Sequence, residues 1–300
     1  MSEAPHPSPP AVEVDHLTKV FSLGRKKQYV VAVEDLTLSI GKGEVYGLIG
    51  PNGSGKSTTM KVVLGLMAPS RGETRIFGVD SREVKSRNDI GFLPENPYFY
   101  KHLTGAETLK FFGKLCNLRG KALKERVEEM LELVDLQDAR NRRLGGYSKG
   151  MLQRIGLAQA MIQKPRLVIL DEPTAGVDPV GSRKIRDLIF QLKEDGISVF
   201  LCSHLLEQVQ EVCDRVGMIL AGKMNREGTV DELCQITEKT QLVLDGASPE
   251  ILAKIRSIAG DALIEEGHPK ATLEELFLDM VEQGEVNKAA VEDADIRSAS

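Results

Sequence analysis

The chain has 300 residues and a formal net charge of −5, so its overall charge gives no case for nucleic-acid binding. No apolar run approaches the roughly 20 residues that a membrane-spanning helix needs, and residues 1–10 are proline-rich without the apolar segment of a secretory signal. We expect residues 1–10 to be a disordered leader. The four cysteines form no C-x-x-C pair, which favours a reducing, cytosolic compartment.

The first predicted elements are strands. Residues 12–20 and 36–40 alternate well enough to be two antiparallel strands of a hairpin, joined by a polar loop. The apolar residues 45–49 predict a buried strand, and residues 58–67 predict a helix. The segment between this strand and this helix carries the strongest functional motif of the chain.

That segment, Gly50-Pro51-Asn52-Gly53-Ser54-Gly55-Lys56-Ser57, matches the phosphate-binding loop G-x-x-x-x-G-K-[ST] at every fixed position. Backbone N–H groups of such a loop surround the phosphates of a nucleotide, and the dipole of the following helix favours the anion. We expect Lys56 to reach the β- and γ-phosphates and the Ser57 hydroxyl to ligate Mg²⁺. The candidate nucleotide-binding residues of this loop are Gly50, Pro51, Asn52, Gly53, Ser54, Gly55, Lys56, Ser57 and Thr58.

The middle of the chain predicts helices. Residues 103–134 are helix-rich, and Thr104 with Glu107 has the spacing of a capping box at a helix start. A buried helix face is predicted by apolar residues at helical spacing, namely Leu123, Val127, Met130, Leu131 and Val134.

Two further apolar runs, residues 167–170 and 197–201, fit parallel strands covered on both faces. The first run is followed by Asp171 and Glu172. These two residues stand at the carboxyl end of the predicted strand, and open α/β sheets bind their ligands at the carboxyl ends of their strands. We expect Asp171 to hold Mg²⁺ and Glu172 to polarise the water that attacks the γ-phosphate. Adjacent carboxylates repel each other, and a bound cation offsets that repulsion. The order of elements predicts a doubly wound α/β core with a helical insert.

A third motif, Tyr147-Ser148-Lys149-Gly150-Met151, opens a predicted helix that runs to about Gln163. The order of the motifs over about residues 12–235 resembles the nucleotide-binding subunits of ATP-binding cassette (ABC) transporters. The third motif resembles the family's signature, Leu-Ser-Gly-Gly-Gln, but retains only Ser148 and Gly150. The resemblance implies that these two residues contact the γ-phosphate held by the opposite protomer, in a dimer that encloses two ATP molecules.

The same resemblance implies three further roles. Residues 175–178 correspond to the D-loop at the dimer seam, and His204 corresponds to the switch histidine that contacts the γ-phosphate and orients the water. Glu95 stands in the lid loop, where the family more usually has a glutamine that contacts Mg²⁺ and the attacking water. Glu95 would bring a third carboxylate towards Asp171 and Glu172, so our hypothesis is tighter Mg²⁺ binding and less favourable closure without Mg²⁺.

Two assignments leave alternatives open. Phe21 occupies the position of the aromatic residue that stacks on adenine, but Tyr29 stays an alternative because the loop between them blurs the spacing. The aromatic run Pro97-Tyr98-Phe99-Tyr100 falls where the family's membrane subunit docks, and packing within the helical insert is the alternative.

Three segments resemble bacterial ABC-2-type subunits more specifically: Leu93-Pro94-Glu95, the signature, and residues 272–277. This implies export through a separate membrane permease, with the subunit bound to the cytoplasmic face of the cell membrane. The alternative is a soluble ABC ATPase that acts on ribosomes or DNA; such proteins usually carry two cassettes or a long coiled-coil insert, and neither is present. No nucleic-acid partner is expected, and nothing in the sequence identifies the cargo.

The implied fold is a P-loop NTPase of the ABC type, with a mixed-sheet core, an antiparallel β subdomain, a helical subdomain and a small C-terminal α+β lobe. In that lobe, Thr229 with Glu232 predicts a short helix, residues 241–244 a strand, and Ser248 and Thr272 the starts of two helices. The expected boundaries are a leader at 1–10, the ATPase domain at 11–236 with its helical subdomain at about 97–163, the lobe at 237–283 and a disordered tail at 284–300.

Overall fold

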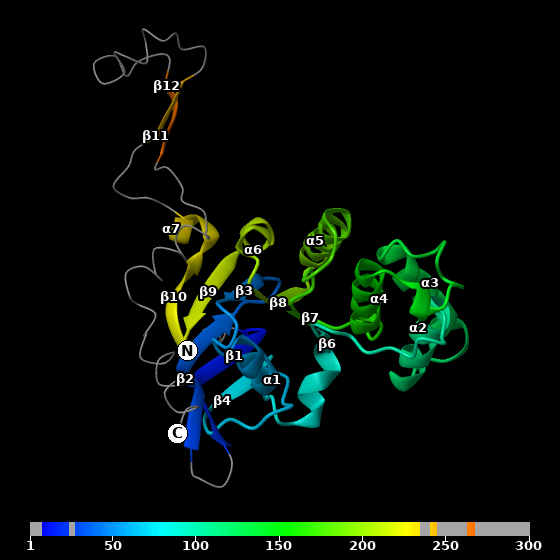
Figure 1. The fold of residues 1–300 in the computed structure, drawn as a ribbon, viewed down its shortest axis with the longest axis horizontal. Coiled ribbons are helices and arrows are strands. Elements are labelled where there is room, and N and C mark those ends of the chain that lie inside the picture. Colours follow the sequence, from blue (N-terminus) through cyan, green and yellow to red (C-terminus); the bar gives the residue numbers. More distant parts are fainter. Residues whose placement is uncertain (1–7, 24–27, 235–240, 245–262, 268–300) are drawn as a thin grey trace, which may run out of the picture.

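The computed structural model describes residues 8–23, 28–234, 241–244 and 263–267 (Figure 1). Its centre is a six-stranded sheet with the order β10-β9-β3-β8-β7-β6. Strands β9, β3, β8, β7 and β6 run parallel, and β10 is antiparallel to β9. The bounds of these strands are β3 Val45–Ile49, β6 Ile90–Leu93, β7 Leu167–Asp171, β8 Ser198–Ser203, β9 Arg215–Leu220 and β10 Lys223–Thr229.

The central strands are buried on both faces, as the continuous apolar runs predicted. Alternate residues of β7 and β8 belong to two different cores: Val168 and Val199 pack with the helices on one face, whereas Ile169 and Phe200 pack on the other. The two-sided burial confirms the predicted α/β core.

The second sheet is antiparallel, with the order β2-β1-β4-β5. The predicted hairpin is confirmed, although β1 (Val12–Leu23) and β2 (Gln28–Ile40) are longer than expected. Strands β4 (Arg71–Ile76) and β5 (Val79–Asp80) complete the sheet, which packs on α1 (Lys56–Val63) and shares one core with the central sheet.

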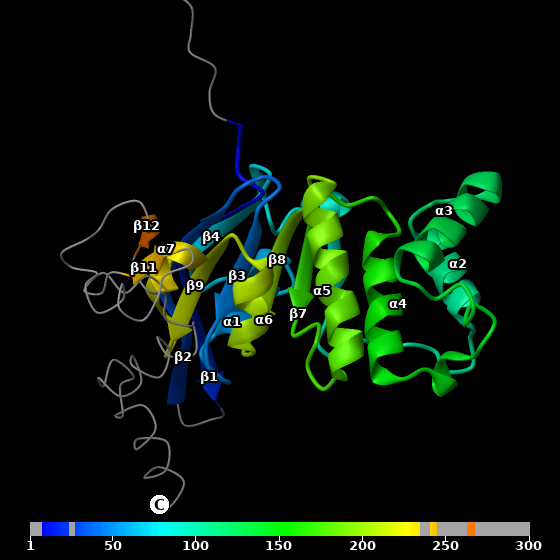
Figure 2. The ribbon, with the colours of Figure 1, turned by 90° about the horizontal axis from the view of Figure 1, so that it is seen from above.

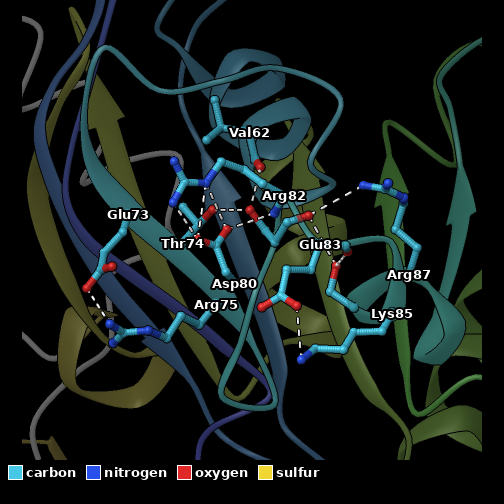
Figure 3. A network of polar contacts seen from close by, with 11 residues as sticks. Val62, Glu73, Thr74, Arg75, Asp80, Arg82, Glu83, Lys85 and Arg87 are labelled. Atoms are coloured by element: carbon cyan, nitrogen blue, oxygen red, sulfur yellow. Dashed lines mark hydrogen bonds and ion pairs between the residues drawn. The ribbon is translucent and has the colours of Figure 1, made fainter.

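A buried polar network holds α1 against this second sheet (Figure 3). The hydroxyls of Thr74 and Ser81 lie 2.5 Å apart, and the Ser81 hydroxyl donates to the carbonyl of Val62 in the last turn of α1, at 3.2 Å. Because all three groups are buried, these bonds fix the end of the helix that begins in the phosphate-binding loop.

Helix α1 differs from the predicted range of 58–67. It begins two residues earlier, inside the loop, and ends at Val63. Gly65 has a φ of 65° and donates its N–H to the carbonyl of Val62, while Leu66 donates to Lys61. This pair of bonds is a Schellman motif, which stops the helix at a glycine.

Helices α2 (Gly105–Leu115), α3 (Gly120–Leu133) and α4 (Lys149–Met161) gather at one end of the molecule, and α4 is the one nearest the sheet (Figures 1 and 2). The capping box of Thr104 and Glu107 is present, and the predicted apolar face of α3 is buried. Helices α5 (Pro179–Glu194) and α6 (Leu206–Val212) follow β7 and β8, and the short 3₁₀ helices are η1 (Val84–Asp89) and η2 (Leu144–Gly146).

Near the end of the described residues, α7 (Val230–Cys234) begins with the predicted capping box of Thr229 and Glu232. The predicted strand at 241–244 is β11, which pairs with β12 (Leu263–Gly267). The helices predicted from Ser248 and Thr272, most of the predicted leader and the tail lie outside the described residues. Across the described ranges, every helix is too short or too polar to span a membrane.

Candidate functional site

The phosphate-binding loop lies between β3 and α1, pressed against the hairpin strand β2. Gly55 has a φ of 109°, and a Cβ atom on it would lie 2.5 Å from the carbonyl oxygen of Ala32. Only glycine satisfies both conditions without strain. Ala32, on β2, therefore forms one wall of the site, and no motif in the sequence marks it.

Lys56 lies inside the loop. Its side chain is buried, and Nζ donates to the carbonyls of Gly50 at 2.7 Å and Pro51 at 3.1 Å. Ser57, the next residue, is exposed at the start of α1. The ammonium group and the hydroxyl are thus held at the helix N-terminus, where a phosphate is bound most favourably.

A cavity of about 230 Å³ opens above the loop. It brings together residues predicted from four separate motifs, because Glu95, Glu172 and His204 face the phosphate-binding loop across it. The lining is Ala32, Asn52, Gly53, Gly55, Lys56, Ser57, Thr58, Glu95, Glu172 and His204.

Glu172 and His204 are joined directly. Oε2 of Glu172 lies 2.8 Å from Nδ1 of His204, and it also accepts from the His204 N–H and the Ser203 hydroxyl, each at 3.4 Å. A carboxylate only accepts hydrogen bonds, so Nδ1 of His204 carries the proton and Nε2 is left for another partner. Glu172 has a φ of 50°, a strained conformation that is characteristic of functional sites.

Asp171, at the end of β7, lies beside this pair. Its Oδ1 atom is buried and has no hydrogen-bond partner among the described residues. Burial raises the pKa of Asp171, and the carboxylates of Glu172 and Glu95 raise it further, whereas Lys56 and Lys61 lower it. A hard cation supplies both the missing partner and the missing positive charge, so the residues present fit Mg²⁺.

Ser148 and Gly150 lie outside the cavity, at the N-terminus of α4. The Ser148 hydroxyl is exposed and accepts from the Met151 N–H at 3.2 Å, which caps the helix. Gly150 packs close to Val177 of the predicted D-loop, since a Cβ atom on it would lie 3.0 Å from that side chain. The structure brings these two motifs together with each other and not with the phosphate-binding loop of the same chain.

The aromatic residues considered for adenine stacking lie on the hairpin and do not line the cavity. Phe21 pairs with Val30, and the neighbouring Ser22 pairs with Tyr29. Adjacent register positions point to opposite faces, so Phe21 and Tyr29 face opposite sides of the hairpin. Tyr29 is 64% exposed, whereas Phe21 is half-buried with Lys19 Nζ 5.2 Å from its ring centre.

The aromatic run after the lid loop divides into a buried and an exposed part. Phe99 is buried and packs on Phe112, with 6.4 Å between the ring centres, which matches packing within the helical insert. Tyr98 is 90% exposed, and Tyr100 forms an exposed edge-to-face pair with Phe111. Docking of a partner on the exposed part stays a prediction.

Comparison with known proteins gives this site its family. The family described as ABC transporter matches residues 33–175. An uncharacterized ABC transporter ATP-binding protein of a Nostoc species is 37% identical over 279 residues, which cover 91% of this chain and 82% of that protein. The chain belongs to the ABC transporter ATP-binding proteins.

Another relative is the bacitracin transport ATP-binding protein BcrA of Bacillus licheniformis, which is 38% identical over 227 residues, covering 74% of this chain and 71% of BcrA. Among solved structures, an ATP-binding cassette in a dimeric, post-hydrolysis state with ADP and phosphate bound aligns with a TM-score of 0.67 and 27% identity. That alignment covers 73% of this chain and 98% of the cassette. The ABC-type P-loop fold is confirmed, and this ABC protein is an ATPase subunit of a transporter.

Proposed function

We propose that this ABC ATPase hydrolyses Mg²⁺-bound ATP between two copies of the chain and so drives a separate membrane permease, in the direction of export. The observation that carries the proposal is the convergence of Glu95, Glu172 and His204 on the phosphate-binding loop, beside an unpaired oxygen of Asp171. This supports ATP hydrolysis at the cavity and not nucleotide binding alone.

Mg²⁺ would be held by Ser57, Glu95 and Asp171. A bound Mg²⁺ neutralises phosphate charge as a Lewis acid. The support lies in the raised pKa of Asp171, caused first by burial and then by Glu172 and Glu95, because a cation bound at Asp171 would offset that repulsion.

The chain's own residues divide the chemistry. Lys56 binds the phosphates, since its ammonium group already lies at the carbonyls of the loop that would surround them. Glu172 accepts a proton from the attacking water. His204, held through Nδ1, contacts the γ-phosphate by donating from Nε2, which requires a proton on both ring nitrogens. The hydrogen bond between Glu172 and His204 keeps the two side chains in a fixed relative position for these roles.

The second copy would complete the site. Ser148 and Gly150 lie at the N-terminus of a 13-residue helix and away from the cavity of their own chain. Ser148 is exposed there, so this helix end suits the nucleotide of the partner. The dimeric ADP-bound cassette supports this arrangement. We assign Phe21 to adenine stacking because it is the more buried of the two hairpin aromatics.

The domain boundaries follow the same scheme. We take residues 11–236 as the ATPase domain and residues 97–163 as its helical subdomain. The segment 237–283 would be an accessory lobe between this domain and the tail.

A role in transport is supported by the BcrA relative, whose name states bacitracin transport. Export is the direction that the resemblance to ABC-2-type subunits implies. The exposed group of Tyr98, Tyr100 and Phe111 offers an apolar docking surface next to the lid loop. We infer that the protein is bound peripherally at the cytoplasmic face of the cell membrane. No observation favours the alternative of action on ribosomes or DNA.

The proposal is tested by copurification and turnover. Tagged protein should retain an integral membrane protein and show ATPase activity that ribosomes and DNA do not stimulate. Lys56→Met removes a charge-assisted phosphate contact of about 2–3 kcal/mol, so the Kd for ATP should rise about 30- to 150-fold. Turnover stimulated by ribosomes, or unchanged ATP affinity in the variant, would contradict the proposal.

A further inference from the structure

Helix α4 lies along β6 and along the lid loop that follows it. At the far end of this contact, Gln163, just beyond the helix, donates Nε2 to the carbonyl of Ile90 at 2.5 Å. Nearer the middle, the backbones come so close that a Cβ atom on Gly91 would lie 2.3 Å from the carbonyl oxygen of Ala160. At this point β6 and α4 pack backbone against backbone.

The contact continues towards the active site. A Cβ atom on Gly156 would lie 2.5 Å from Leu93, the last residue of β6. One turn further along the helix, Gln153 donates Nε2 to the carbonyl of Glu95 at 2.8 Å. At each end of the contact, a glutamine side chain, Gln163 or Gln153, thus donates a hydrogen bond to a backbone carbonyl.

The environment of Gln153 is unusual for an amide. Its side chain is 1% exposed, and its Oε1 atom has no hydrogen-bond partner among the described residues. Burying an amide with one half unpaired is unfavourable, and most buried polar atoms are paired. Among the described residues, the Gln153 side chain therefore makes one hydrogen bond, to the carbonyl of Glu95.

This bond joins two parts of the catalytic machinery. Glu95 lines the cavity, as do Lys56 and Glu172. Helix α4 begins with its cap, Ser148, only five residues before Gln153. Among the described residues, the bond from Gln153 to Glu95 is the hydrogen bond that joins the lid loop to the first part of α4.

We propose that Gln153 is a positioning residue, which holds the backbone of Glu95 to α4 so that the Glu95 carboxylate and the Ser148 end of the helix keep one relative position. The inference rests on the proposed roles of Glu95 and Ser148. Gln153 touches neither the phosphates nor the attacking water; it acts through Glu95.

Gln163 supplies a matched control. It makes the same kind of bond, from Nε2 to a backbone carbonyl of the same segment, but its acceptor, Ile90, does not line the cavity, whereas Glu95 does. Methionine has a similar length and volume and cannot donate, so Gln153→Met and Gln163→Met each remove one amide donor without opening a cavity. Gln163→Met also removes the acceptor of the Cys116 thiol, so it is the more disruptive of the two for packing.

The test compares the full-length variants in three measurements. Gln153→Met should keep the Kd for ATP within about twofold of wild type, because the phosphate-binding loop is intact. Its Mg²⁺ concentration for half-maximal ATPase activity should rise about tenfold, the effect of losing one hydrogen bond of about 1.4 kcal/mol. Gln163→Met should change the melting temperature by at least as much as Gln153→Met does and leave the Mg²⁺ dependence unchanged.

A double variant separates positioning from packing. If Gln153 acts through Glu95, adding Gln153→Met to Glu95→Ala should cost no further activity. Independent, additive losses, or equal losses of activity in Gln153→Met and Gln163→Met, would overturn the inference. An inactive wild-type protein would instead overturn the proposed function, so the two failures are distinguishable.

Discussion

At the residue scale, Asp171 lies in an unfavourable environment for a negative charge. One of its oxygens is buried without a partner among the described residues, and its pKa is raised by burial, by Glu172 and by Glu95. Such an arrangement is unfavourable for the nucleotide-free protein and favourable for a cation. Asp171 therefore lowers the stability of the nucleotide-free protein while it provides a ligand for the cation.

Asp171→Asn should therefore stabilise the nucleotide-free protein. Because the pKa of Asp171 is raised above its ordinary value of 3.8, the folded protein holds a proton that the unfolded chain has released, and stability falls as the pH rises through this window. Above the window, the variant should be more stable by about 1 kcal/mol, or about 2–4 °C in Tm.

Thermal unfolding of both proteins without nucleotide, over the pH range from acid to neutral, measures this difference. The variant should also lose the additional stabilisation that Mg²⁺ gives in the presence of ATP. A variant with a lower Tm than wild type at neutral pH would show that Asp171 is not in an unfavourable environment.

Glu95→Gln tests the unusual lid-loop residue. It removes one of the carboxylates that raise the pKa of Asp171, so ATP binding without Mg²⁺ should become easier and binding of Mg²⁺ weaker. ATP binding to both proteins, with Mg²⁺ and with a chelator, measures the effect. We expect the ratio of the two affinities to fall about tenfold, which corresponds to about 1.4 kcal/mol; an unchanged ratio would remove the hypothesis.

At the scale of elements, the packing of the phosphate-binding loop on β2 is the contact that shapes the cavity. Gly55→Ala should disturb it, because the new Cβ atom would lie 2.5 Å from the Ala32 carbonyl at a φ of 109°. We expect a loss of about 1–3 kcal/mol in stability and weaker ATP binding.

Gly53→Ala is the matched control for this substitution. Gly53 also has a positive φ, of 80°, but a Cβ atom there would have no neighbour within 4 Å. Chemical denaturation of both variants separates backbone strain from collision with β2. If the two variants lose the same stability, the contact with Ala32 does not position the loop.

The sequence predicted most elements because local patterns determine them. The hairpin of β1 and β2, the buried strands β7 and β8, and both capping boxes depend on alternation, apolar runs or a three-residue spacing. The end of α1 was wrong because the Schellman motif at Gly65 was not recognised.

The site could be predicted only where a motif carries the chemistry. Glu95, Glu172 and His204 were expected around the phosphate-binding loop, and the structure brings them there. Ala32 and Gln153 were missed because their positions depend on contacts between segments far apart in the sequence, and neither has a residue type that indicates chemistry.

At the scale of the whole molecule, the signature residues lie apart from the phosphate-binding loop of the same chain. Ser148 and Gly150 do not line the cavity that Lys56 and Glu172 line, so a single copy would present half of each of two sites. Two copies arranged head to tail would then enclose two ATP molecules, and ATP would be part of the interface. Self-association should therefore depend on ATP.

The most direct measurement is the mass of Glu172→Gln in solution with and without ATP. The amide oxygen can still accept the bonds from Ser203 and His204, so the site should keep its shape while proton transfer from water is lost. Turnover should fall by about 10²–10⁴. We predict a monomer without nucleotide or with ADP, and a stable dimer holding two ATP molecules when ATP and Mg²⁺ are present. A variant that stays monomeric with ATP, or that hydrolyses ATP at the wild-type rate, would contradict the account.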